Sequence, residues 1–333
     1  MSHNSKPVLA LTAAEVKQLL PMEECIELMA DSLAAFSRGA VHQPLRTMIS
    51  PTGAKGLFAL MPAYRQDENC VYGLKAVSVF PGNPIHGKDA HQGIVMLFDG
   101  STGEPLAMMG SPIITALRTA AVSAVATHLL ARENAVELAI IGAGVQARTH
   151  LAALSCVRPL KRVRVVSREP AHSNQLAREM QPEFSFAIEP VRLVEEALRG
   201  AEVIVVVTNA TEPVLRYEWI TPGAHINAIG AHSPDAREID SDTMAAASIF
   251  VDSRESALNE AGDYCLAASE GRIGPQAIKA EIGELLNGLG PGRTSPQEVT
   301  LFKSLGLAVE DMACAEFLFK KAQEQNVGTW VEF

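Results

Sequence analysis

The chain has 333 residues, of which 47% are hydrophobic and 20% are charged, and its formal net charge is −10. This length suits about two domains with a substantial core, and the composition is that of an ordinary globular protein. The acidic balance, without any basic run, argues against nucleic acid as a partner, and no apolar run approaches the roughly 20 residues that cross a membrane.

The five cysteines are scattered and form no C-x-x-C pair. Buried free thiols in a reducing compartment are the simplest interpretation, so we expect neither a disulfide framework nor a metal site. The N-terminal residues lack the apolar region of a secretion signal. Together these features predict a cytoplasmic protein.

The first part of the chain combines helical and strand-like patterns. Residues 12–39 carry apolar side chains at helical spacing, and the alanine-rich residues 115–132 predict one long helix. The pattern of residues 1–124 therefore predicts an α+β domain. Glycine and proline separate its strand-like segments, as is typical of an antiparallel sheet. These segments lie at 47–50, 56–61, 71–80, 93–99 and 105–110.

The most specific motif follows the apolar run at 138–141. The next six residues read Gly-Ala-Gly-Val-Gln-Ala, the G-x-G-x-x-A pattern of a dinucleotide-binding turn. Gly142 permits the tight turn, Gly144 leaves room for a pyrophosphate, and the small Ala147 lets the following helix pack close to the strand. The helix N-terminus then offers free N–H groups to the phosphates.

Strand and helix patterns alternate after this motif, which predicts right-handed crossovers and a doubly wound parallel sheet. We place this Rossmann-type domain at 125–305. Residues 297–325 read as a last amphipathic helix, and a C-terminal helix within 306–333 would complete the first domain. The predicted fold class is thus α/β, a Rossmann-type doubly wound domain plus an N-terminal α+β domain. Within the Rossmann-type domain, the predicted strands after the glycine motif lie at 162–167, 202–208, 225–230 and 248–252, and the predicted helices at 172–180 and 191–198.

Several separated motifs give the chain a family resemblance over nearly its whole length. It resembles the ornithine cyclodeaminase/mu-crystallin family, whose members act on a carbon that bears nitrogen beside a carboxylate, with a nicotinamide cofactor. The resemblance implies homodimers in which the sheets of the two first domains join edge to edge, because exposed sheet edges need a partner or cover. The motifs that carry it lie at 73–77, 114–124, 142–150, 208–213, 251–263 and 300–311.

Three cations are candidates for binding a substrate carboxylate. Arg46 follows Gln43-Pro-Leu and on its own could be a surface arginine beside a turn. Lys75 interrupts an apolar strand pattern, where it must be paired, face a cleft or point outward. Arg118 is the charge in a small, apolar helical stretch and could also snorkel. The resemblance implies that all three contact substrate, and that Lys75 is also catalytic.

Cofactor contacts are expected at the glycine-rich turn and at the ends of later strands. Ser167 and Arg168 end the second strand, where an arginine accepts a 2′-phosphate, so we expect NADP(H) to be preferred. Glu169 is adjacent and would admit NAD(H) if it turned inward. The full set of expected cofactor residues is Thr119, Gly142, Ala143, Gly144, Val145, Gln146, Ser167, Arg168, Thr208, Asn209, Gly230 and Ser304.

His232 marks a departure from the cyclodeaminase pattern, in which an acid–base aspartate stands two residues before a proline. Here that position is His232, before Pro234. A histidine titrates near neutrality and can protonate a developing amine, although it could also cap a strand end. Asp235 is an alternative acid–base group, but its spacing does not match.

The sequence therefore predicts a homodimeric NAD(P)H-dependent reductase of α-imino acids, reversible as an L-amino-acid dehydrogenase, with catalytic Lys75 and His232. Its partner would be a small imine or amino acid that bears a carboxylate. The alternatives are an ornithine cyclodeaminase, which releases ammonia from L-ornithine to give L-proline, and a crystallin-like cofactor-binding protein without significant turnover.

Overall fold

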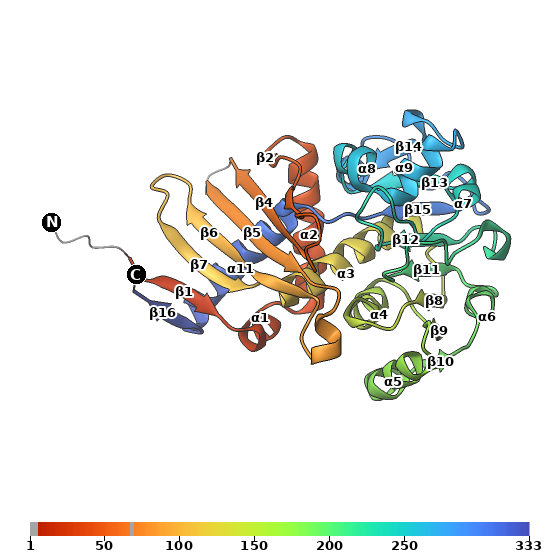
Figure 1. Cartoon of the computed structure of the whole chain (residues 1–333), viewed down its shortest axis with the longest axis horizontal. Helices are drawn as coiled ribbons and strands as arrows, with labels where there is room; N and C mark the ends of the chain where they lie inside the picture. The colour runs from red at the N-terminus through yellow and green to blue at the C-terminus, as the bar shows by residue number, and fades with distance from the viewer. Residues whose placement is uncertain (1–5, 67–69, 333) are drawn as a thin grey trace. The chain divides into compact units, whose positions relative to one another are not determined.

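The computed structural model describes residues 6–66 and 70–332 and divides into two compact units (Figure 1). The first unit contains the described residues up to Arg118 together with those from Leu307 onward. The second unit runs from Thr119 to Gly306. The sequence analysis places the corresponding boundaries after residues 124 and 305.

Among the described residues, the first unit contains an eight-stranded sheet with the strand order β16-β1-β7-β6-β5-β4-β2, in which β3 also pairs with β4. Only β1 and β7 are parallel neighbours in this described sheet, and the other pairs are antiparallel. The strands are β1 (Val8–Leu11), β2 (Val41–His42), β3 (Thr47–Ile49), β4 (Leu57–Arg65), β5 (Val71–Val79), β6 (His91–Asp99), β7 (Pro105–Gly110) and β16 (Thr329–Val331).

Helix α11 (Ala308–Gln325) crosses one face of this sheet (Figure 1) and packs also on α2 (Met22–Ser37). The close approach depends on Gly73 of β5, because a Cβ there would lie 2.6 Å from Cγ of Met312. Helix α1 (Ala13–Leu19) begins with a capping box, in which Thr12 and Glu15 satisfy each other's backbone N–H groups. The segment 83–86 is a short 3₁₀ helix.

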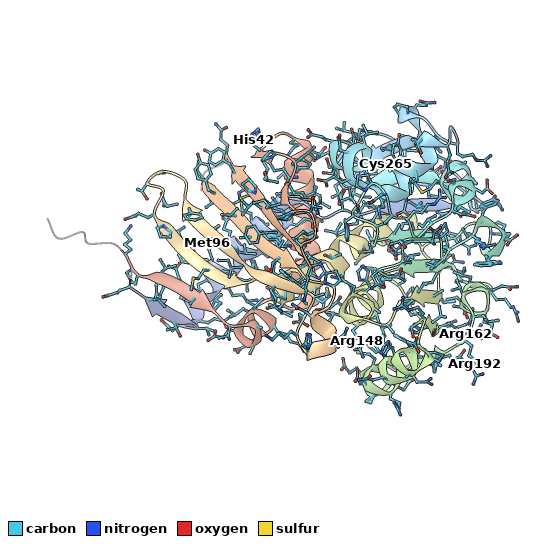
Figure 2. The ribbon with its side chains drawn as sticks, in the orientation of Figure 1. His42, Met96, Arg148, Arg162, Arg192 and Cys265 are labelled. Atoms are coloured by element: carbon cyan, nitrogen blue, oxygen red, sulfur yellow. The ribbon has the colours of Figure 1, made fainter. Side chains whose placement is uncertain are left out.

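The opposite face of the sheet is apolar and partly open. Because side chains alternate along a strand, the residues paired across β4, β5 and β6 project together on this face. Phe58, Tyr72 and Ile94 are 40%, 49% and 41% exposed, and Met96 lies on the same sheet (Figure 2). The rings of Tyr64 and Tyr72 lie 4.5 Å apart, between centroids.

Helix α3 (Ser111–Leu130) contains the boundary between the two units. Within the described ranges it is the one helix long and apolar enough to cross a membrane, by length and composition only. However, 78% of its most apolar window is buried in the protein. Such burial is typical of a core helix.

The second unit, all of whose residues are described, contains an eight-stranded parallel sheet in the order β10-β9-β8-β11-β12-β15-β13-β14. The chain order reverses between β8 and β11, which is the switch point where doubly wound sheets bind ligands. The strands are β8 (Glu137–Ile141), β9 (Arg162–Val166), β10 (Ala187–Pro190), β11 (Val203–Val206), β12 (His225–Ala228), β13 (Ser248–Val251), β14 (Ile278–Glu281) and β15 (Thr300–Lys303).

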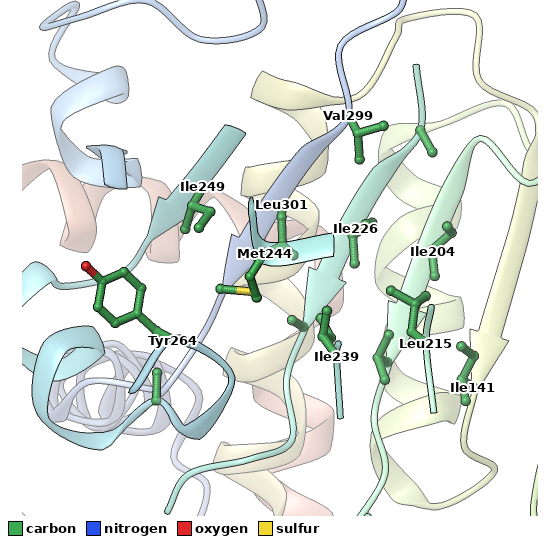
Figure 3. Packing of buried hydrophobic residues seen from close by; sticks show 14 of the residues in the cluster. Ile141, Ile204, Leu215, Ile226, Ile239, Met244, Ile249, Tyr264, Val299 and Leu301 are labelled. Carbon is green, nitrogen blue, oxygen red and sulfur yellow. The ribbon is translucent and has the colours of Figure 1, made fainter. Parts of the chain in front are cut away.

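Buried side chains of the central strands form the core of this unit (Figure 3). Ile204, Ile226 and Leu301 project from three neighbouring strands, and Met244 packs against them. The helices of the unit are α4 (Val145–Val157), α5 (Pro170–Met180), α6 (Val194–Leu198), α7 (Ser241–Ala246), α8 (Arg254–Glu260), α9 (Gly262–Ser269) and α10 (Ile282–Leu286), with 3₁₀ turns at 181–183, 217–219 and 275–277.

The α/β fold class with a doubly wound sheet is confirmed. The prediction of one helix over 297–325 is wrong at its start, because residues 300–303 form the buried strand β15 between β12 and β13. Four consecutive buried residues fit a parallel strand as well as a buried helix, so periodicity alone did not separate the two.

Candidate functional site

The turn after β8 has the geometry that a dinucleotide pyrophosphate requires. Gly142 has a φ of +116°, and a Cβ there would lie 2.4 Å from the carbonyl oxygen of Val207. A Cβ on Gly144 would meet nothing within 4 Å, so that side of the turn is open. Helix α4 begins at Val145 without a side-chain cap, which leaves its first N–H groups for an anion. The residues therefore fit a nicotinamide dinucleotide.

Arg148 stabilises this turn from within α4 (Figure 2). Its Nη1 donates to the carbonyl oxygens of Ala143 at 2.7 Å and Gly144 at 3.2 Å. Its Nη2 pairs with Glu179 of α5 at 2.5 Å. Because the guanidinium satisfies two carbonyl groups of the turn, it fixes the conformation of the loop that precedes α4. The sequence analysis did not identify Arg148 as a functional residue, although it follows the glycine motif directly.

At the end of β9, Ser167 and Arg168 have different environments. The Ser167 hydroxyl donates to the carbonyl of Glu169 at 2.7 Å and accepts from the N–H of Ser173 at 3.1 Å. This fixes the turn into α5. Arg168 is exposed. An exposed cationic side chain at the end of β9 is thus available to a ligand phosphate.

Thr208 and Ser304, the predicted cofactor residues after β11 and β15, are held by buried carboxylates. The N–H of Thr208 donates to Glu238 at 2.6 Å, and its hydroxyl accepts from the N–H of Ala210 at 3.0 Å. Ser304 donates to Asp252 at 3.4 Å, and the same carboxylate accepts from the backbone N–H groups that follow Ser304. These strand ends are therefore rigidly supported.

His232 lies on an exposed segment that follows an unusual backbone turn. Ala231 adopts a φ of +55°, a conformation that residues with a Cβ rarely take. Downstream, Ser233 donates to the carboxylate of Asp235 and lowers its pKa. Asp235 is thereby held ionised, which disfavours it as a proton donor.

Lys75 and Arg118 meet within the first unit. Lys75 is 4% exposed, and its Nζ donates to the Thr115 hydroxyl at 2.7 Å and to Asp311 at 3.1 Å. Nη1 of Arg118, itself 5% exposed, lies 2.8 Å from Glu310, and its Nε lies 3.6 Å from Asp311. The outward-facing interpretation of Lys75 and the snorkelling interpretation of Arg118 are both excluded by this burial.

The environment of Lys75 brings its titration close to neutrality. Burial lowers the pKa of Lys75, Asp311 opposes this effect, and the charge of Arg118 adds to it, so that the pKa is about 8. Burial also lowers the pKa of His91, and the charges of Lys75 and Arg118 contribute. The charges of both cations therefore extend to His91, which begins β6 and is exposed.

Arg46 lies in the partly buried segment between β2 and β3. Gln43 anchors this segment, because its Oε1 accepts from the N–H of Val309 at 2.9 Å, next to Glu310. The role of Arg46 at a carboxylate stays a prediction.

The carboxylates that hold the cations of the first unit and the cofactor residues of the second were not identified from the sequence. Glu310 and Asp311 pair with the cations of the first unit, and Glu238, Asp252 and Asp263 support the strand ends of the second. Their signal in the sequence is an acidic residue inside an apolar stretch, as in Leu-Ala-Val-Glu-Asp-Met. Within residues 6–66 and 70–332, no cluster of three or more metal-binding side chains occurs.

Comparison with known proteins agrees with the family resemblance. The model of the "Ornithine cyclodeaminase/mu-crystallin family" matches residues 7–326. Ketimine reductase mu-crystallin from Mus musculus is 40% identical over 313 residues, which cover 93% of this chain and 96% of the mouse protein.

Two solved structures share the fold over nearly the whole chain. One is Thermococcus litoralis Δ1-pyrroline-2-carboxylate reductase in complex with NADH and L-proline, with a TM-score of 0.93 at 39% identity. The match covers 97% of this chain and 99% of the reductase chain. A dimeric archaeal alanine dehydrogenase with bound NAD has a TM-score of 0.92 at 33% identity, with coverage of 98% and 99%.

Proposed function

Because this chain belongs to the ornithine cyclodeaminase/mu-crystallin family, we propose that it is an NAD(P)H-dependent reductase that converts α-imino acids, linear or cyclic, to L-amino acids. The chain is an oxidoreductase that acts on carbon–nitrogen bonds, as expected from its sequence. The pyrroline-2-carboxylate reductase and the ketimine reductase support an imine with a neighbouring carboxylate as the substrate class.

The observation that carries the proposal is the buried ammonium of Lys75. An ammonium has three N–H groups. Thr115 and Asp311 take two of them, which leaves one N–H for a ligand. A buried, charge-assisted donor of this kind suits a carboxylate or an imine nitrogen. We assign the substrate carboxylate to Lys75, Arg118 and Arg46.

The chain's side chains would bind, orient and protonate the substrate, and a bound nicotinamide would supply the hydride for the imine carbon. With a pKa of about 8, Lys75 is charged at neutral pH and can still give up a proton to the product nitrogen. His232 is the second candidate proton donor. The loop at 142–146 would bind the pyrophosphate.

We propose further that NADP(H) is preferred over NAD(H). The support is the exposed guanidinium of Arg168 at the end of β9, where a ribose 2′-phosphate would lie. Both solved relatives named above carry NADH or NAD. Direct competition between the two cofactors therefore tests this proposal.

We propose that the chain forms a homodimer through the first sheet, and that the copies meet on its open apolar face rather than at the sheet edge that the resemblance implied. The exposed residues of this face include Phe58, Tyr72 and Ile94, on three neighbouring strands. A contiguous apolar face of this kind is typical of a protein–protein interface. The dimeric alanine dehydrogenase supports a second copy as the partner.

The decisive experiment is an assay of NADPH and NADH oxidation with a panel of cyclic imines and of 2-oxo acids supplied with amines. Ornithine conversion and ammonia release are measured alongside. We expect imine-dependent oxidation of the cofactor. Ornithine conversion faster than reduction of every imine would instead identify a cyclodeaminase, and cofactor binding without turnover would identify a binding protein.

A further inference from the structure

A buried cluster of three charged side chains lies at the carboxyl ends of strands in the second unit. Lys303 ends β15, Asp263 lies on α9, and Glu238 precedes α7, and none is more than 1% exposed. Nζ of Lys303 lies 2.8 Å from Oδ2 of Asp263 and donates to the carbonyl of Gly230. The cluster therefore holds the turn after β12 through the carbonyl of Gly230, two residues before His232.

Glu238 also contacts the turn after β11. Its Oε1 accepts from the N–H of Thr208 at 2.6 Å, while its buried Oε2 has no hydrogen-bond partner among the described residues. A Cβ on Gly230 would lie 2.1 Å from this Oε2. The backbone of Glu238 is fixed, because Asp263 accepts from its N–H at 2.7 Å. One carboxyl group thus touches both predicted cofactor turns, at Thr208 and Gly230.

The net charge of the cluster depends on Glu238 alone when the ion pair is intact. The charged groups that face Glu238 are Lys303 from β15 and Asp263 from α9. The Lys303–Asp263 pair is neutral overall, so the cluster carries no net charge with Glu238 protonated and one negative charge with it ionised. Burial raises the pKa of Glu238 to about 7, although Lys303 opposes that rise. Both forms are therefore populated near neutral pH.

The position of the Glu238 carboxyl group in the fold makes its charge relevant to cofactor binding. In doubly wound sheets each half binds one mononucleotide outside the carboxyl ends of its strands. The glycine turn after β8 belongs to the first half, and β11 and β12 belong to the second, which would take the nicotinamide half. Oxidised nicotinamide carries a positive charge and the reduced ring does not. A carboxylate near a nicotinamide bound in this half would therefore favour the oxidised form.

We propose that Glu238 is a positioning residue whose protonation follows the redox state of the cofactor. It holds a proton when NADH is bound, and it releases that proton to solvent when NAD⁺ is bound. No electron passes through the carboxyl group, and only its O–H bond breaks. This inference rests on the proposed function, because it requires a nicotinamide cofactor in the second unit.

The test compares binding of NAD⁺ and NADH to the full chain by calorimetry across neutral pH. NAD(H) is the suitable probe, because the 2′-phosphate of NADP(H) would itself titrate near pH 6. From about pH 6 to about pH 8 we expect the affinity for NAD⁺ relative to NADH to rise about three- to tenfold. In Glu238→Gln this ratio should stay constant. The matched control is Glu195→Gln, an exposed glutamate of the same unit, which should behave as the unmodified chain.

Proton counting gives a second readout that needs no variant. Calorimetry at pH 7 in buffers of different ionisation heat reports the protons released, and we expect more release with NAD⁺ than with NADH. Equal proton release in the unmodified chain, or a pH-dependent ratio retained in Glu238→Gln, would overturn the inference. Failure of the unmodified chain to bind NAD(H) and NADP(H) alike would instead overturn the proposed function, and this inference with it.

Discussion

Nζ of Lys75 lies 3.1 Å from Oδ1 of Asp311, and the two residues are 236 positions apart in the sequence. The same oxygen lies 3.6 Å from Nε of Arg118. One buried carboxylate therefore serves two buried cations. A lone buried ammonium tends to lose its proton, so this carboxylate is what keeps Lys75 charged at neutral pH.

The first prediction concerns Asp311→Asn. Since Asp311 raises the pKa of Lys75, its loss should lower that pKa by about one to three units. Substrate binding by a charged Lys75 is lost as the pH rises through this pKa, about 8 in the unmodified chain. The alkaline limb of kcat/KM should therefore move to lower pH, as measured by a pH–rate profile. Asp31→Asn, an exposed change in the same unit, should leave the limb in place.

The carboxylate clamp is tested by Arg46→Ala and Lys75→Ala. Each should reduce kcat/KM for an imine by at least about 100-fold, equivalent to about 2.7 kcal/mol of transition-state stabilisation. The Kd for NADPH should barely change, because neither residue belongs to the pyrophosphate turn. Lys55→Ala removes an exposed cation from the same unit and serves as the control. Near-native turnover in either clamp variant would show that the substrate site is elsewhere.

Arg168→Ala tests the preference for NADP(H). Loss of one charge-assisted phosphate contact, about 1.5–3 kcal/mol, should raise the KM for NADPH by about 10- to 100-fold. The KM for NADH should change little. Arg178→Ala, an exposed arginine on α5, provides a matched loss of charge. Equal effects of Arg168→Ala on both cofactors would contradict the assignment.

His232 separates reduction from cyclodeamination. A neutral imidazole can protonate nitrogen near pH 7 but gives no negative charge to attract a distal ammonium. We therefore expect measurable imine reduction and little ornithine cyclisation. Steady-state assays of His232→Asn should show slower reduction with a flatter pH dependence near neutrality, while His232→Asp should begin to accept diamino acids. His172→Asn, an exposed change on α5, is the control.

The dimer is tested on the open face of the first sheet. Tyr72→Glu or Ile94→Glu would place a charge among apolar neighbours, so light scattering at micromolar concentration should report a monomer. Ile85→Glu changes a side chain that is 86% exposed but lies off the sheet, and it should leave a dimer. A monomeric unmodified chain would refute the proposal itself.

The features that the sequence predicted are those with a local signature. The turn at Gly142 was identifiable because a positive φ and a close approach to Val207 both demand glycine. Lys75 was identifiable as a cation in an apolar strand, but its orientation was not, because alternation leaves two faces open. The structure resolved this by placing Asp311 beside it.

The features that the sequence missed depend on contacts between distant segments. The raised pKa of Glu238 arises from its burial, which the charge of Lys303, 65 positions away, opposes, and nothing local to Glu238 signals either effect. The strand β15 was taken for the start of a helix because its pairing with β12 and β13 is long-range. Periodicity describes one segment at a time, whereas these properties belong to pairs of segments.

The discontinuous first unit has a consequence for synthesis on the ribosome. All strands of its sheet except β16 are made early, as are the cations Lys75 and Arg118, but the carboxylates Glu310 and Asp311 come from α11 after the whole second unit has been translated. Until then the nascent first unit lacks both its counter-ions and the helix that covers its sheet. The second unit, made of one uninterrupted stretch, can reach its native state first. The N-terminal segment is thus the part of the nascent chain most in need of chaperone protection.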